Sequence, residues 1–190
     1  MINPQQTARE HLRPDEHLYW AGTSDPAKLL SGRDGFLIPF SLLWCGFVAF
    51  WTASAVTSGA PPFFLLVGSL FTLMGLHLLV GRFLVKRYRK RTSVYAVTDR
   101  RALVITPRGT REVPIGRTDR TVSWTGDRRH CNVEWDATGG GPGSMLVGRG
   151  TNAKVYANTG LDGFFGPQPM AFWDVTDGDA LVRELDRASS

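Results

Sequence analysis

The middle of the chain lacks formal charge. From Gly35 to Gly81 there is no Asp, Glu, Lys or Arg in 47 consecutive residues. A helix on the surface of a soluble domain needs a polar face about every other turn, so this stretch excludes a simple soluble enzyme. The charged residues, 21% of the chain, lie on either side of it, and an apolar content of 43% also excludes a disordered tail.

Cysteine is scarce as well, since the 190 residues include only Cys45 and Cys131. Cys45 lies in the apolar stretch and Cys131 in the polar part, so a bond between them would require one of them to leave its solvent. We expect two free thiols, as is usual in a reducing compartment. The chain is therefore not a disulfide scaffold.

The charge-free stretch divides into two apolar segments at the turn-forming residues 58–62. Segment 36–57 has 22 residues and segment 63–83 has 21, and a helix of that length spans about 30 Å of hydrocarbon. The alternatives are two buried helices of a soluble core, which a domain of this size could hardly enclose, and a signal peptide, which would begin nearer the N-terminus. We therefore expect a hairpin of two transmembrane helices in a multi-pass protein of the cell membrane.

Charge also predicts the orientation of the hairpin. The leader, residues 1–35, has net charge −1, residues 82–91 have +6, and residues 92–190 are balanced. Under the positive-inside rule the basic end of the second helix is cytoplasmic, so both termini should be cytoplasmic. The sequence pI near 9.6 might suggest nucleic acid, but one basic cluster beside a membrane is better explained by topology.

The basic cluster is a candidate site for anionic lipid headgroups, together with two arginines at a predicted hairpin tip and two phenylalanines that would enter the membrane interface. In the simpler alternative, the cluster only fixes topology and the phenylalanines belong to the core. The residues are Arg82, Lys86, Arg87, Arg89, Lys90 and Arg91 for the cluster, Arg128 and Arg129 for the tip, and Phe164 and Phe165 for the interface.

After the basic juxtamembrane segment, 84–91, the pattern changes to short strands separated by turns, followed by one amphipathic helix with Leu181 and Leu185 on its apolar face. This predicts an α+β, mainly β domain over residues 92–190, with a partly open antiparallel barrel capped by the C-terminal helix. The predicted strands are 94–98, 102–106, 111–115, 121–125, 131–135, 144–147, 154–157 and 170–175.

The run TSVYAVTDRRALVIT, Thr92 to Thr106, follows a two-helix hairpin and a basic stretch. It resembles the start of the bacterial pleckstrin-homology-like (PH-like) domain of small membrane proteins. LRPDEHLYWAG, Leu12 to Gly22, is similar to the segment that often precedes the hairpin in such proteins. The resemblance implies a seven-stranded, helix-capped partial barrel that serves as a binding or assembly module, and it supplies no catalytic residues to carry over.

Catalysis finds little support in the sequence. His11, His17, His77 and His130 are spread along the chain without metal-ligand spacing, so we expect no metal, no cofactor and no small-molecule substrate. His77 is an ionisable residue within the second predicted span, and such a residue suggests a functional role. The simpler interpretation is a neutral imidazole that is hydrogen-bonded to the partner helix. An enzyme would need a site that the order of strands does not reveal.

We therefore expect a non-catalytic, membrane-tethered module that binds another membrane or cytoplasmic protein or associates with itself. The alternative is an anionic-lipid-binding module. Small residues on both spans would permit close packing between chains, or simply within one hairpin. They are Gly46, Ala49 and Ala53 on the first span and Gly68, Thr72 and Gly75 on the second.

Overall fold

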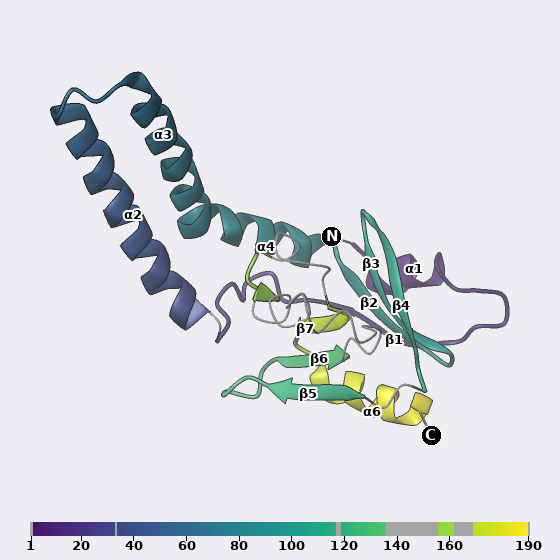
Figure 1. Ribbon diagram of the computed structural model, residues 1–190. Helices are drawn as coiled ribbons and strands as arrows, with labels where there is room; N and C mark the ends of the chain where they lie inside the picture. The colour runs from purple at the N-terminus through teal and green to yellow at the C-terminus, as the bar shows by residue number, and fades with distance from the viewer. Residues whose placement is uncertain (1, 33, 117–118, 136–155, 162–168, 190) are drawn as a thin grey trace, which may run out of the picture.

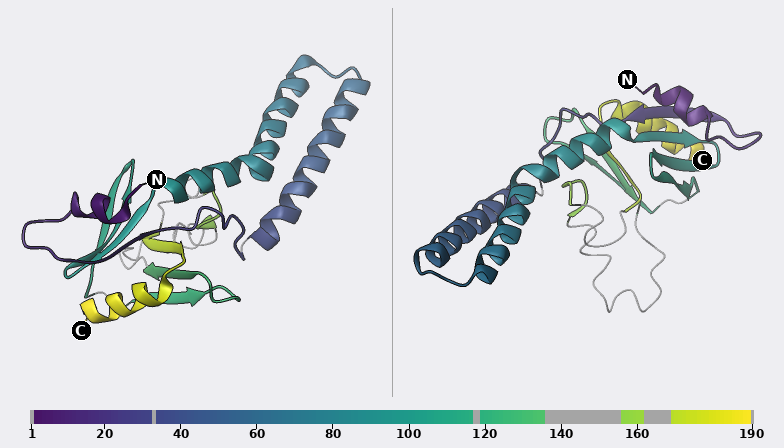
Figure 2. Two further views of the ribbon diagram at one scale, coloured as in Figure 1. Left: turned by 180° about the vertical axis from the view of Figure 1, so that it is seen from behind. Right: turned by 90° about the horizontal axis from the view of Figure 1, so that it is seen from above.

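The computed structural model describes residues 2–32, 34–116, 119–135, 156–161 and 169–189 (Figure 1). It shows an α+β protein with two long apolar helices, two antiparallel sheets and a C-terminal helix. In the views of Figure 2 the helical hairpin projects away from the sheets, so the chain has a long arm and a compact domain.

The arm begins with α2, Asp34–Thr57, and returns through α3, Pro62–Leu76. A single π-helical turn, η1 at His77–Gly81, joins α3 to α4 at Arg82–Thr92, so one continuous helix runs over 31 residues from Pro62 to Thr92. Both long helices are long and apolar enough to cross a membrane. Only 17% and 11% of the residues in their most apolar windows are buried, which does not fit the core helices of a soluble domain.

The first sheet has the order β1-β2-β3-β4, all antiparallel, and its strands are β1 at Leu18–Thr23, β2 at Val94–Thr98, β3 at Arg101–Thr106 and β4 at Gly109–Pro114. The leader thus contributes an edge strand that the sequence analysis missed, because β1 pairs with β2 across the whole hairpin insertion. The short helix α1, Pro4–Arg9, covers the outer face of the sheet, where Ala8 packs against Val94 and Leu103. Because both faces are covered, every residue of β2 is buried.

The second sheet has the order β5-β6-β7, with β5 at Arg120–Trp124, β6 at Cys131–Trp135 and β7 at Ala171–Val175. Side chains from both sheets share one core around the fully buried Phe172. Its ring stacks on Tyr95 at a centroid distance of 4.7 Å and meets Trp135 edge-on at 5.0 Å. Such aromatic pairs add about 0.5–1.5 kcal/mol each beyond their buried area. They hold the two sheets together.

The C-terminal helix α6 spans Gly178–Ser189. Leu181 and Leu185, one turn apart, are fully buried in the shared core, which confirms the helix predicted from their spacing. Gly178 begins the helix where a Cβ would lie 2.4 Å from the Cβ of Cys131, so no larger residue fits there. Burial also raises the pKa of the Cys131 thiol to about 11.

The structure bears on the other predicted elements to different extents. The basic juxtamembrane segment, 84–91, forms part of α4. The described strands form two sheets and no closed barrel. Strand 144–147 lies outside the described residues, and the described end of strand 154–157, from Tyr156 onward, is a helical turn. The remaining predicted strands agree with the observed ones to within two residues.

The leader is attached to the first sheet by a buried ion pair. Arg101 donates from Nε to Glu16 Oε1 and from Nη2 to Glu16 Oε2, both at 2.8 Å, and Thr98 Oγ1 donates to the same carboxylate at 2.8 Å. The Arg101 hydrogen bond lowers the pKa of Glu16 to about 2. The paired arginine and glutamate therefore fix the start of β1 against the turn between β2 and β3.

Replacing Glu16 by glutamine should lower the free energy of unfolding by about 2 kcal/mol, the typical worth of a hydrogen bond to a charged group. The exposed Glu10 provides the control, since Glu10→Gln should leave stability unchanged. Because the folded pKa of Glu16 is depressed, its contribution is complete above the unfolded pKa, near 4.5, and is lost as pH falls toward 2. Denaturant melts at pH 7 and pH 3 measure both effects, and equal melts for the two variants would contradict the ion pair.

Candidate functional site

The residues of the predicted basic cluster lie on two different faces of helix α4. Arg82, Lys86 and Lys90 recur every fourth residue, so they share one helix face, and all three are buried. Arg87 and Arg91 lie on another face and are exposed, while Arg89 is half-buried. The cluster is therefore not one solvated surface, because half of its charges are held inside the protein.

Arg82 and Asp34 form a buried ion pair at the foot of the hairpin, and Arg82 Nε also donates to the Leu78 carbonyl at 2.8 Å. Asp34 begins α2, and its carboxylate accepts hydrogen bonds from the backbone N–H and the hydroxyl of Ser31. Asp34 and Arg82 are the charged residues that directly flank the charge-free stretch. The pair therefore closes the hairpin where its apolar part ends.

Asp174 on β7 lies between two lysines. Lys28, from the segment before α2, approaches Asp174 Oδ1 at 2.7 Å, and Lys90, from the end of α4, approaches Oδ2 at 2.6 Å. Asn158 Nδ2 donates to Oδ2 at 2.7 Å. Burial alone would raise the pKa of Asp174, but the charge of Lys90 and these hydrogen bonds outweigh it and hold the pKa below its ordinary value. The carboxylate joins both ends of the hairpin to the domain.

Close contacts reinforce this junction. Gly160 has a φ of +87°, and a Cβ built on it would lie 2.0 Å from the Arg82 carbonyl oxygen. Only glycine fits both that backbone conformation and that approach. His130 Nε2, at the end of the turn between β5 and β6, is 2.9 Å from Asp25 Oδ2. The arm and the segment before it are thus held to the domain at several points, mainly on the side of the second sheet.

A pocket of about 740 Å³ lies between α4, the β3–β4 hairpin and β7. Its apolar lining includes Leu84 and Val85 of α4, Val104 of β3 and Trp173 of β7. Five cationic residues also line it, and none of its described lining residues is an aspartate or a glutamate. The cations are Lys86, Arg89, Lys90, Arg108 and Arg111.

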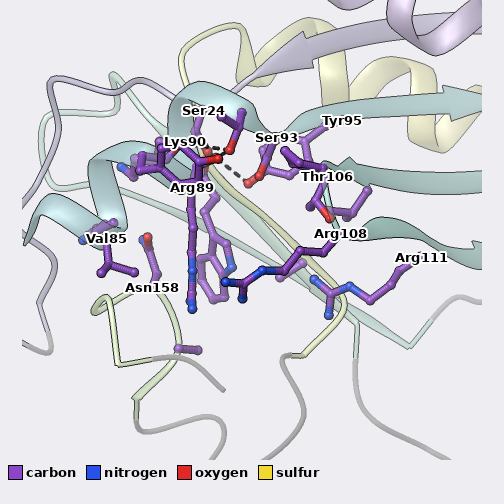
Figure 3. Close-up of a pocket in the computed structure, with 18 of the residues that line it drawn as sticks. Ser24, Val85, Arg89, Lys90, Ser93, Tyr95, Thr106, Arg108, Arg111 and Asn158 are labelled. Atoms are coloured by element: carbon purple, nitrogen blue, oxygen red, sulfur yellow. Dashed lines mark hydrogen bonds between the residues drawn. The ribbon is translucent and has the colours of Figure 1, made fainter. Parts of the chain in front are cut away.

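Figure 3 shows Arg89, Arg108 and Arg111 with their guanidinium groups directed toward the same space. Arg89 comes from α4, Arg108 from the turn between β3 and β4, and Arg111 from β4. Arg111 Nη1 also donates to the Pro169 carbonyl at 3.3 Å, which fixes its direction. Basic side chains from elements distant in the sequence thus gather in one pocket beside the helix that continues from the second apolar span.

The other residues singled out from the sequence lie elsewhere. Arg128 and Arg129 occupy the exposed turn between β5 and β6 and do not line the pocket: Arg128 lies over the Trp124 ring at 5.9 Å, and Arg129 Nε is 3.8 Å from Asp127. His77 begins the π-helical turn. Phe164 and Phe165 fall outside the described residues. No group of three His, Cys, Asp or Glu within the described ranges could hold a metal ion.

Sequence reasoning missed Arg108 and Arg111, which lie next to Arg89 only because the sheet folds back on α4. Lys90 was predicted to bind lipid, whereas in the structure its ammonium group forms an ion pair with the buried carboxylate of Asp174. The fourfold spacing of Arg82, Lys86 and Lys90 could have revealed a buried face had segment 84–91 been interpreted as a helix. The acidic partners are remote in sequence and could not be paired with them in advance.

Comparisons with known proteins add no relative. No family model, curated protein or solved structure matches this chain. The resemblance to bacterial PH-like domains therefore stays a prediction, and the site has to be interpreted from its own geometry.

Proposed function

We propose that the chain is an integral membrane protein whose α2–α3 hairpin crosses the bilayer and whose domain is a non-catalytic interaction module held at the membrane surface. The observation that carries this proposal is the uninterrupted helix Pro62–Thr92, which is apolar at its start and bonded into the domain at its end. A domain attached in this way keeps a fixed height and orientation relative to the bilayer.

The exposed surface of the arm supports the membrane assignment. Large apolar side chains point outward around both helices, and Phe36, Leu43 and Phe50 of α2 and Phe63 and Leu66 of α3 are all more than 60% exposed. Monomeric soluble proteins rarely expose contiguous apolar patches larger than a few hundred Å². Hydrocarbon is the environment that such a surface fits, and the positive-inside rule would then place the domain and both termini in the cytoplasm.

Extraction of membranes at alkaline pH tests the anchor. An integral protein stays with the lipid at high pH and is released only by detergent, whereas a peripheral protein is washed off. We expect the full-length chain in the pellet after carbonate treatment and in the supernatant after detergent. Release by carbonate alone would refute the membrane-spanning hairpin.

Association through a second chain is the less supported version of this proposal. The small residues at the centre of the hairpin already pack within it, since a Cβ on Gly68 would lie 2.8 Å from Thr52 Oγ1 and one on Gly75 would lie 2.7 Å from Cys45 Sγ. Gly46 faces open space in the described structure. A protein partner for the domain remains a proposal, and a pull-down of the tagged chain from gently solubilised membranes tests it.

Contact with anionic lipid is the second candidate function, and the exposed Arg87 and Arg91 favour it. Each basic residue near an anionic surface contributes about 1 kcal/mol. The variant R87Q/R91Q should therefore reduce the salt-sensitive enrichment of phosphatidylglycerol around the chain in mixed-lipid nanodiscs, measured by mass spectrometry of the extracted lipid. The matched control is R100Q/R183Q, which removes two exposed charges from a sheet turn and from α6. Equal enrichment in both variants would contradict lipid contact by the outer face of α4.

A further inference from the structure

The helix that leaves the second apolar span changes direction before it reaches the domain. Figure 1 shows α4 running sideways from the end of α3, and the π-helical turn η1 lies between the two. A π-helical turn is a common cause of such a bend. A helix that crosses the bilayer as α3 would therefore continue as α4 at a slant, at the level where hydrocarbon gives way to headgroups.

The outer face of α4 combines apolar and basic side chains. Four exposed residues with the spacing i, i+3, i+4 and i+7 share this face. They are Leu84, Arg87, Tyr88 and Arg91. Lys90, which is bonded to Asp174 of the domain, lies on the buried face instead. The mixed face is therefore turned away from the contact that attaches α4 to the domain.

The most exposed apolar side chains outside the arm gather near its foot. Outside α2, α3 and η1, the large apolar side chains of the described chain that are 60% exposed or more are Leu30, Leu84 and Tyr88. Leu30 shortly precedes Asp34, and the other two shortly follow Arg82. The apolar surface of the arm thus continues past the Asp34–Arg82 ion pair at both ends of the hairpin.

This composition fits the headgroup layer better than it fits water or hydrocarbon. In water, Leu84 and Tyr88 would stay exposed to solvent, and in hydrocarbon the arginines would lose their hydration. At the interface, apolar bodies enter the acyl boundary while tyrosine keeps its hydroxyl among the headgroups. Arginine side chains on the same face reach the lipid phosphates.

We infer that α4 is an interfacial helix and that its outer face lies in the headgroup layer of the adjacent leaflet, with Leu84 and Tyr88 inserted and Arg87 and Arg91 at the phosphates. This inference rests on the proposed membrane anchor, and it deepens the second candidate function because it adds insertion of apolar side chains to contact by charge. Since Lys90 joins α4 to β7, a helix held in this layer also fixes the tilt of the domain.

Spin-label depth measurement on the full chain in vesicles of phosphatidylglycerol and phosphatidylcholine tests the inference. Labels are attached through Leu84→Cys and Tyr88→Cys, and the references are Leu73→Cys in α3 and Arg100→Cys in the turn between β2 and β3, both at exposed positions. Cys45→Ala removes the thiol of the first apolar helix from all four variants, and Cys131 is fully buried. Depth follows from collisions of the label with oxygen, which is enriched in hydrocarbon, and with a water-soluble nickel chelate.

We expect the labels at positions 84 and 88 within about 10 Å of the boundary between headgroups and hydrocarbon, the label at 73 deeper, and the label at 100 in water. Aqueous values at 84 and 88 beside a deep value at 73 would overturn the interfacial helix and leave the anchor intact. Depths at 84 and 88 equal to that at 73 would place α4 inside the hydrocarbon and overturn it as well. An aqueous value at 73 would refute the anchor together with the interfacial helix.

Discussion

Replacing Asp174 by asparagine should lower the free energy of unfolding by about 3–5 kcal/mol, the usual cost of removing one partner from a buried ion pair. The substitution keeps the shape of the side chain, but it leaves two lysine ammonium groups, one of them only 4% exposed, around a neutral amide. Denaturant unfolding of the full chain in mild detergent, followed by tryptophan fluorescence, measures the loss, with Trp173 next to the site as a local reporter.

Asp177→Asn is the matched control for this prediction. Asp177 lies three residues further along the chain, is exposed, and immediately precedes α6, where asparagine caps a helix as well as aspartate does. This variant should unfold like the original chain. If Asp174→Asn proved equally harmless, the carboxylate would not be what joins the hairpin to the domain.

The same carboxylate predicts a loss of stability in acid. Because the pKa of Asp174 is lower in the folded protein than its ordinary value of 3.8, the ion pairs contribute fully above the unfolded pKa and are lost as pH falls through the folded one. Glu16 titrates in the same acidic range, so the informative quantity is the difference between the original chain and Asp174→Asn. That difference should be constant from pH 5 to pH 7 and shrink below pH 4.

The second large effect is expected at the foot of the hairpin. Arg82→Met or Asp34→Asn alone should each cost about 3–5 kcal/mol, because each leaves the other charge buried and unpaired. Combining Arg82→Met with Asp34→Leu removes both charges, and it should cost clearly less than the sum of the two single replacements Arg82→Met and Asp34→Leu. The measurement is a double-mutant cycle of unfolding free energies in detergent, and additive losses would contradict a coupled pair.

The sequence predicted those elements whose signal is local. A charge-free stretch divided by Pro61 and Pro62 is sufficient to place two apolar helices, and the spacing of Leu181 and Leu185 is sufficient to place α6. Strand β1 was missed because its partner β2 is separated from it by the whole hairpin. Nothing local to Leu18–Thr23 indicates that it completes a distant sheet.

The candidate site could be predicted only in part, for the same physical reason. A run of basic residues is visible in the sequence, but whether each one faces solvent or a buried acid depends on how α4 packs. Lys90 meets an aspartate 84 residues away, and Arg108 reaches the pocket through the fold of the sheet. Residue type predicts a charge at such positions, whereas long-range packing decides its role.

Cysteine labelling from each side of the membrane tests the central claim most directly. Ser58→Cys places a thiol in the hairpin loop, and Gly126→Cys places one at the tip between β5 and β6, where a Cβ has open space. The native thiols should contribute little background, because Cys131 is fully buried with a raised pKa and Cys45 lies within the first apolar helix.

A membrane-impermeant maleimide is applied to right-side-out and inside-out vesicles. The account predicts that position 58 reacts only in right-side-out vesicles and position 126 only in inside-out ones. Reaction of both positions from the same side would contradict a hairpin that crosses the bilayer.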